Sequence, residues 1–162
     1  MLADSSACFY EVCKLESQDS KAPPFTLKVD ATLPQYQKAR IARFAPKRGN
    51  QAAIVTNVGL HLVDLNAKQE SHLLVQLDIV ALEYSPCDSY VVCCEKWNHQ
   101  SPQENLFIIC TRTGKVVARF NWQKSPKESM KSIRFSQDER YCIRLVPNPG
   151  SNSKEPNSIE VY

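Results

Sequence analysis

The sequence of 162 residues predicts an all-β protein built from WD40-like β-propeller blades. One stretch, Ile79 to Phe120, contains four apolar runs separated by turn signals, which is the pattern of a four-stranded antiparallel sheet. Related patterns precede and follow this stretch at a spacing of roughly 40 to 50 residues, which is the period of propeller blades. A blade buries its apolar faces only by stacking on its neighbours. The repeats therefore predict part of a propeller.

The first run of the central stretch shows the period of a half-buried strand. Alternation places Val80, Leu82 and Tyr84 on one expected face. The following Ser-Pro-Cys-Asp sequence predicts a turn in which the Asp88 side chain bonds its own backbone.

The other three strands of this sheet have equally clear limits. Tyr90 to Cys94 and Leu106 to Cys110 are the expected second and third strands. Thr113-Gly114 allows the chain to reverse, because glycine accepts a positive φ without steric cost. Val116 to Phe120 is then the expected fourth strand.

The same pattern occurs three times. Three motifs can be superposed: Phe44-Ala45-Pro46, Tyr84-Ser85-Pro86 and Phe135-Ser136-Gln137. This superposition also aligns Ala42, Leu82 and Ile133. We predict repeats at about 38–77, 78–120 and 130–162, so that about two and a half to three blades are present and the chain ends before the last blade is complete. The alternative is a small open β-sandwich, whose exposed strand edges would invite pairing.

Residues 1–37 are the least regular part of the sequence. Ala7 to Cys13 and Phe25 to Val29 alternate and are expected to form strands. Two arrangements remain open for this segment: a clasp strand that completes the last blade of a closed propeller, or a loosely attached arm. The polar run Glu16 to Ala22 favours the arm, at least locally.

Composition indicates a cytoplasmic protein without a membrane segment. The net charge of +3 is only mildly basic. The seven cysteines are an odd number, and Cys93 and Cys94 are adjacent within a strand, so reduced thiols are the simpler expectation than a disulfide framework. The sequence has no signal-peptide pattern, and no apolar stretch approaches the length that spans a bilayer.

A basic cluster in the first repeat is the candidate site for RNA or ribosome contact. Its five residues, with no acid among them, are Lys38, Arg40, Arg43, Lys47 and Arg48. Cations on a strand and the turn after it form a plausible surface for phosphates. The alternative is a solvated blade edge.

Two tryptophans mark candidate partner contacts. Trp97 lies in a polar insertion, Glu95 to Glu104, where it either contacts a partner or folds back on the blade. Trp122 is followed by Lys124 and Lys127 in a connection that can stack a base and hold its backbone. More often, such a connection buries its Trp between blades and leaves the lysines in water.

The sequence shows no catalytic, cofactor or metal motif. With four glycines it has no phosphate-cradling loop and no G-x-S-x-G elbow. The three histidines, His61, His72 and His99, lie in different contexts, and none neighbours a Ser or Cys nucleophile in sequence. We therefore expect a protein without enzymatic activity, cofactor, metal or small-molecule substrate.

Several segments together resemble a known family. They are Leu82-Glu83-Tyr84-Ser85-Pro86, Thr111 to Lys115, Ala118-Arg119-Phe120, and Ser132 to Glu139 followed by Cys142-Ile143-Arg144. Over about residues 38–162 the chain resembles the N-terminal WD-like propeller of eukaryotic translation initiation factor 2A. The chain departs from WD repeats in lacking a Trp-Asp pair at the end of any third strand, and its first 37 residues match the family poorly. The similar propeller of subunit b of eukaryotic translation initiation factor 3 follows an RNA-recognition domain, for which residues 1–37 are too few.

This resemblance implies a cytoplasmic scaffold that works with the small ribosomal subunit, other initiation factors and initiator methionyl-tRNA. It also implies that tRNA binding belongs mainly to regions outside this chain, and it supplies no site residue. The alternative is a general WD-repeat adaptor that binds a peptide on one face of the disc.

Overall fold

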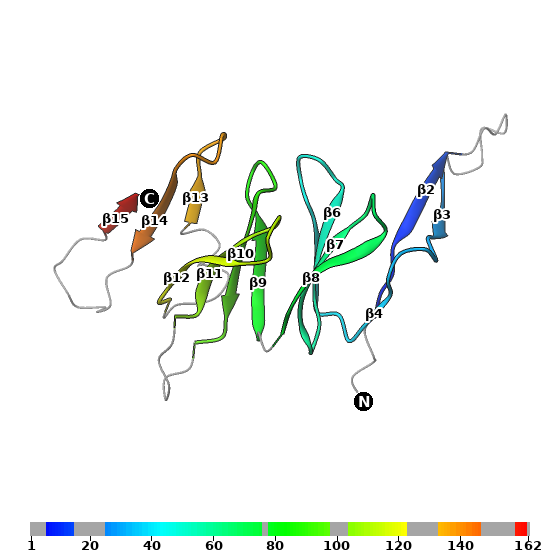
Figure 1. Cartoon of the computed structure of the whole chain (residues 1–162), viewed down its shortest axis with the longest axis horizontal. Coiled ribbons are helices and arrows are strands. Elements are labelled where there is room, and N and C mark those ends of the chain that lie inside the picture. The colour runs from blue at the N-terminus through cyan, green and yellow to red at the C-terminus, as the bar shows by residue number, and fades with distance from the viewer. Residues whose placement is uncertain are drawn as a thin grey trace.

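A computed structural model describes residues 6–14, 25–75, 78–97, 104–122, 133–146 and 158–161, with backbone only at 11–14, 25–26, 146 and 158. Within these residues the protein is all-β, which confirms the predicted fold class. The sheets follow one another along the molecule like the blades of a fan (Figure 1).

The first two blades are complete four-stranded antiparallel sheets. In the first, the strand order is β5 (Ile41–Phe44), β6 (Gln51–Val55), β7 (Gly59–Asp64) and β8 (Gln69–Val75). In the second it is β9 (Ile79–Tyr84), β10 (Tyr90–Glu95), β11 (Leu106–Cys110) and β12 (Val116–Phe120). In both sheets each strand pairs with the strand that precedes it in sequence, because short turns connect antiparallel neighbours.

The third blade has three strands in the described part of the chain. They are β13 (Ile133–Phe135), β14 (Cys142–Val146) and β15 (Ser158–Val161), paired in that order. The register confirms the predicted alignment of the repeats: Ala42 lies opposite Ile54, Leu82 opposite Cys93 and Ile133 opposite Arg144, at the same position of each sheet. Each first turn closes with the same backbone bond, donated by Ala45, Ser85 or Ser136.

Each sheet presents one face to the blade before it and one to the blade after it, here called the backward and forward faces. Between the first two blades, Ala53, Val55 and Leu62 of the first forward face share a core with backward-face residues such as Val91 and Cys93. A second core joins Val92 and Cys94 to Ile133 and Cys142 of the third blade. Apolar burial between consecutive blades is therefore what stacks the fan.

The N-terminal strands cover the backward face of the first blade. β1 (Ser6–Ala7) pairs with β4 (Tyr36–Gln37), and β2 (Tyr10–Lys14) pairs with β3 (Phe25–Val29), so the two strand regions expected from alternation are present. Phe9 and Tyr36 are buried against Ala52, Ile54 and Val63 of the first sheet. Described residues of this segment are thus packed on the first blade, on its far side from the second (Figure 1).

The predicted faces of β9 are wrong at Val80. The pairing of β9 with β10 is irregular there, since Ala81 lies opposite Cys94 but Ile79 lies opposite Glu95, which leaves Val80 as a bulge residue. The extra residue reverses the alternation, so Ile79 is buried with Leu82 while Val80 is 37% exposed. Strict alternation cannot anticipate one inserted residue.

Carboxylates also connect the blades at their first turns. Asp88 accepts hydrogen bonds from the backbone N–H groups of Lys47 (3.0 Å) and Arg48 (2.7 Å) in the preceding blade. Glu139 accepts one from the N–H of Cys87, again one blade back. The predicted bond of Asp88 to its own turn is therefore wrong: both carboxylate oxygens accept from the neighbouring blade instead. We call these contacts the carboxylate clamps.

The clamp at Glu139 makes part of the stability depend on pH. Burial raises the pKa of Glu139, but hydrogen bonds from Ser85, Ser89 and Cys87 outweigh burial and place this pKa below its ordinary value. A lowered folded-state pKa gives stability that is present above the unfolded-state pKa and is lost as pH falls through the folded one. We expect Glu139→Gln to flatten the fall in unfolding free energy on the acid side of about pH 4.5, the ordinary value. Urea titrations at a series of pH values measure it, and an unchanged slope would contradict the clamp.

Among the described residues, no helix is long and apolar enough to cross a membrane.

Candidate nucleic-acid interface and polar cleft

The turns between the first and second strands of the three blades lie on one side of the fan, at the top of Figure 1. They comprise residues 45–50, 85–89 and 136–141, and we call this side the turn rim. In an antiparallel sheet the turn between the third and fourth strands emerges at the same end. Residues 65–68 and 111–115 therefore also belong to the turn rim.

The structure divides the predicted basic cluster between the two ends of β5. Lys38 and Arg40 precede the strand, and Arg43 lies within it. Lys47 and Arg48 follow in the turn, on the turn rim. All five side chains are exposed, so they remain available to solvent, but they do not form one continuous patch.

Arg40 already forms contacts within the protein. Its guanidinium lies 2.8 Å from the carboxylate of Asp78 and also donates to the carbonyl of Thr56 at 3.4 Å. Both partners of this ion pair are exposed, so it contributes little to stability, although it offsets the charge locally. Among the described residues, Arg40 is the one member of the cluster that forms an ion pair.

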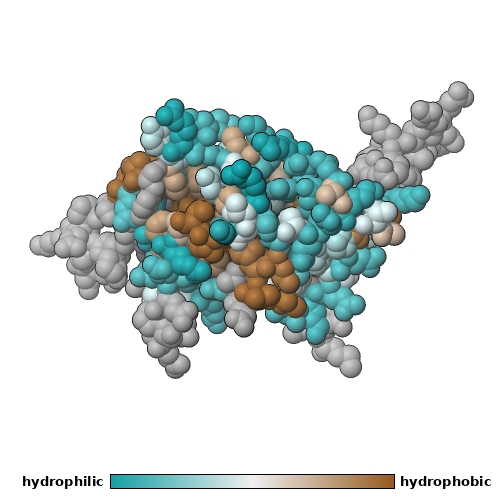
Figure 2. All heavy atoms as spheres, in the orientation of Figure 1, coloured by the Kyte–Doolittle hydropathy of each residue, from teal (hydrophilic) through white to brown (hydrophobic). Residues whose placement is uncertain are grey.

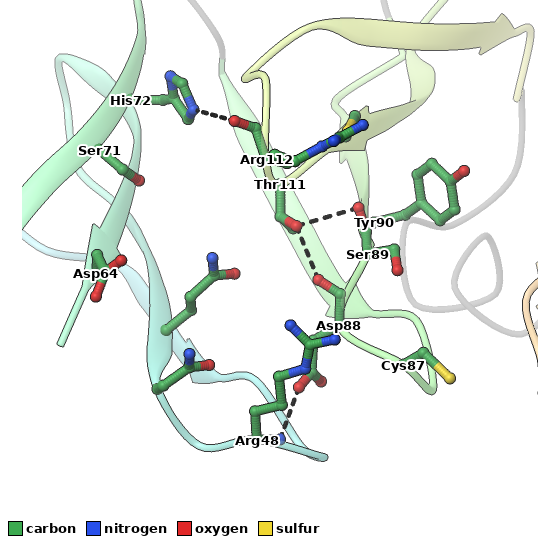
Figure 3. A pocket seen from close by; sticks show the side chains of 13 residues that line it. Arg48, Asp64, Ser71, His72, Cys87, Asp88, Ser89, Tyr90, Thr111 and Arg112 are labelled. Carbon is green, nitrogen blue, oxygen red and sulfur yellow. Dashed lines mark hydrogen bonds between the residues drawn. The ribbon is translucent and has the colours of Figure 1, made fainter. Parts of the chain in front are cut away.

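A polar cleft of about 520 Å³ opens between the first two blades, beside Lys47 and Arg48 (Figure 3). Arg48 reaches into it from the first blade, and Arg112 lies on the wall formed by the second. Thr111 and His72 fix this wall: the Thr111 hydroxyl donates to the carbonyl of Asp88 at 2.8 Å, and His72 Nε2 lies 3.0 Å from the Arg112 carbonyl oxygen. The cleft is therefore built on tied strand ends.

The two acidic residues of the cleft accept hydrogen bonds from backbone N–H groups of this chain. Asp64 accepts from the N–H groups of Asn66 and Ala67 in the following turn, both at 2.9 Å. Asp88 forms the clamp described above. Of the charged side chains that line the cleft, those of Arg48 and Arg112 are exposed, whereas Asp88 is buried and Asp64 is partly buried. Sequence analysis missed Arg112, which is distant in sequence from the basic cluster.

A second group that sequence analysis missed surrounds His61. Its Nε2 lies 2.9 Å from the Thr56 hydroxyl, and its Nδ1 contacts the carboxylate of Glu70. Tyr36 packs on the His61 ring at 4.6 Å and donates to Glu70, and burial raises the pKa of Tyr36 above its ordinary value. Thr56 and His61 are buried, and the Thr56 oxygen also accepts the N–H of Val58. The group therefore holds the turn after β6 against the N-terminal strands.

The predicted partner contacts have different outcomes. Trp122 is 3% exposed and packs in the core between the second and third blades, while its backbone N–H donates to the Asn105 side chain at 2.7 Å. This burial removes Trp122 from the candidate contacts. Trp97 is half-buried directly after β10, and its role stays a prediction. Lys124 and Lys127 lie outside the described residues. No group of metal-ligating side chains occurs in the ranges that the structure describes.

No protein-family model and no curated protein sequence matches the chain. Solved structures share its fold. The crystal structure of a eukaryotic initiation factor aligns with a TM-score of 0.63 and 21% identity, over 75% of this chain and 31% of that one. The Pyrococcus horikoshii acylaminoacyl peptidase aligns with a TM-score of 0.52 and 16% identity, over 80% and 24% of the two chains.

The β-propeller domain of the trilobed protease from Pyrococcus furiosus aligns with a TM-score of 0.51 and 13% identity, over 80% of this chain and 41% of that one. The chain thus spans between about a quarter and two fifths of these proteins. At such identities the likeness establishes the fold and not the activity. The chain consists of stacked β-propeller blades.

Proposed function

We propose that this chain is a non-catalytic scaffold domain of a cytoplasmic translation initiation factor, and that it contacts RNA of the small ribosomal subunit through its turn rim. The observation that carries the proposal is the charge arrangement there. Lys47, Arg48 and Arg112 are exposed, whereas the nearby Asp64 and Asp88 are held by backbone N–H groups. Exposed cations beside less exposed carboxylates favour phosphate contact.

Two further considerations support this proposal. The segments that resemble initiation factor 2A lie in the second and third blades, and a structure of a eukaryotic initiation factor is similar in fold. In this proposal initiator tRNA and other initiation factors are partners of the assembled factor, with tRNA held mainly outside this chain.

Charge reversal provides the test. The double variant Lys47→Glu, Arg48→Glu is expected to reduce cosedimentation of the chain with purified small ribosomal subunits at low salt. If these cations contact phosphates, the dependence of log affinity on log salt becomes shallower by about 0.7 to 0.9 for each phosphate that is no longer neutralised. Arg40 is left unchanged, because it holds Asp78 and Thr56.

The matched control reverses two exposed lysines away from the turn rim, Lys28 and Lys96. It introduces the same change in net charge. Equal losses in both variants would indicate nonspecific attraction, and undiminished binding of the first variant would refute contact through these residues.

The polar cleft favours a second candidate function, an adaptor that binds an acidic peptide between Arg48 and Arg112. Arg112→Ala distinguishes the two proposals, because Arg112 lies on the cleft wall of the second blade. If the chain is a peptide adaptor, Arg112→Ala lowers the affinity for a poly-glutamate probe and leaves ribosome binding nearly unchanged. A ribosome-binding scaffold would show the loss in subunit cosedimentation.

A further inference from the structure

The forward face of the third blade differs from its counterparts in exposure. The residues that occupy the same register positions are Ala53, Val55 and Leu62 in the first blade and Val92, Cys94 and Ile108 in the second. All six are at most 5% exposed, because the following blade covers them. In the third blade the positions hold Ile143, Leu145 and Val161, which are 43%, 45% and 66% exposed. Figure 2 shows apolar groups at the surface toward this end of the molecule.

The described carboxylate clamps also end at the third blade. Asp88 reaches back to the first blade and Glu139 reaches back to the second, both from a left-handed backbone position with φ of 68° and 57°. The Asp138 N–H occupies the turn position of the Lys47 and Cys87 N–H groups. Among the described residues, no carboxylate of another blade reaches the Asp138 N–H. Within the described residues, the carboxylate contacts between blades and the apolar cover therefore end at the same boundary, where the Asp138 carboxylate bonds within its own turn.

An aromatic pair adds to the contact between the second and third blades, whereas the first blade has Gln51 at the corresponding position. Tyr90 of the second blade stacks on Phe135 of the third, with ring centroids 5.7 Å apart and ring planes 6° apart. Tyr141 occupies the position of Tyr90 in the third blade and is 55% exposed. In both covering blades the aromatic residue precedes the clamp acid by four positions, as Tyr84 precedes Asp88 and Phe135 precedes Glu139.

We propose that the forward face of the third blade is the docking surface for one further antiparallel β-blade, whose first turn carries an aromatic residue followed four positions later by Asp or Glu. The aromatic residue stacks on Tyr141, and the carboxylate accepts the Asp138 N–H. Aliphatic residues on the backward face of that blade cover Ile143, Leu145 and Val161.

The first blade of a second copy does not fit this description. It carries Phe44 at the aromatic position, but the left-handed position of its turn holds Gly49, with φ of 65° and no carboxylate. Its backward face is also occupied by Phe9 and Tyr36. The partner is therefore a blade other than the first blade of this chain.

The second blade provides a probe with the required chemistry. The full chain is extended by a copy of residues 111–132, which carries the turn before the fourth strand, β12 and the connection that follows it, and then by a copy of residues 79–120. This copy carries Tyr84 and Asp88 at the required spacing. Amide hydrogen exchange of Asp138 reports on the new clamp, and we expect it to slow at least tenfold relative to the unextended chain.

Two variants separate specific docking from general apolar cover. Asp88→Ala within the added copy removes the acceptor and is expected to restore fast exchange at Asp138. Ile143→Lys in the original blade is expected to leave the unextended chain folded, because Ile143 is exposed there, but to abolish the protection in the extended chain. Unchanged exchange in the extended chain, or equal protection by the Asp88→Ala copy, would overturn the proposal. So would protection of Asp138 by self-association of the unextended chain, which concentration-dependent sedimentation detects.

Discussion

Gly59→Ala is expected to destabilise the first blade severely. A Cβ atom at this position would lie 2.0 Å from the carbonyl oxygen of Leu74 and 2.9 Å from its carbonyl carbon. These atoms belong to the backbone of β8, the strand that pairs with β7 directly beside Gly59, so no side-chain rotation relieves the clash. The φ of 156° adds strain for any residue with a side chain.

The two strands must therefore separate locally, and the Thr56 N–H that donates to the Gly59 carbonyl is disturbed with them. Overpacking and backbone strain each cost about 1 to 3 kcal/mol, so we expect a loss of roughly 3 kcal/mol in the free energy of unfolding. Urea denaturation monitored by tryptophan fluorescence measures this loss.

Gly49→Ala is the matched control. Gly49 also has a positive φ, of 65°, but nothing lies within 4 Å of the position of an added Cβ. Only the left-handed backbone is penalised, at about 1 kcal/mol. Equal losses at the two glycines would show that backbone conformation, and not the approach of β8, sets the cost at Gly59.

The strand pattern could be predicted because it depends on local properties. Alternation, the proline-containing turns and Gly114, whose φ is 66°, define where each strand begins and ends. The alignment of the three repeats then placed Ala42, Leu82 and Ile133 at one register position, as the pairing shows. A bulge at Val80 escaped prediction, since a single inserted residue leaves the composition of the strand unchanged.

The candidate site was less predictable because it depends on contacts between blades. The basic residues of the first repeat are close in sequence, yet β5 separates Arg40 from Arg48, whereas Arg112 lines the same cleft as Arg48 from the second blade. Likewise, the partners of His61 come from different elements, with Thr56 after β6 and Glu70 in β8. Spacing along the chain carries no signal for such pairs.

Asp88→Ala is the second substitution with a large expected effect, because Asp88 is the acceptor that connects the first two blades. The side chain is 4% exposed, and its two oxygens accept the N–H groups of Lys47 and Arg48. Removing the acceptor leaves two part-buried N–H donors without this partner, each at a cost of about 1 to 3 kcal/mol where water does not replace the carboxylate. We expect a loss of roughly 3 kcal/mol in unfolding free energy, and faster amide exchange at Lys47 and Arg48.

Two further variants assign this loss to the carboxylate. Asp88→Gly removes the same acceptor but accommodates the positive φ of this position, so it isolates the clamp from the backbone cost. Asp138→Ala removes an exposed carboxylate that accepts only from its own turn, from the Ser136 hydroxyl and the Arg140 N–H, and it is expected to cost much less. If Asp88→Gly were as stable as the native chain, the loss in Asp88→Ala would belong to the turn. Stacking would then rest on the apolar faces alone, and the clamp acid could no longer serve as a requirement for a further blade.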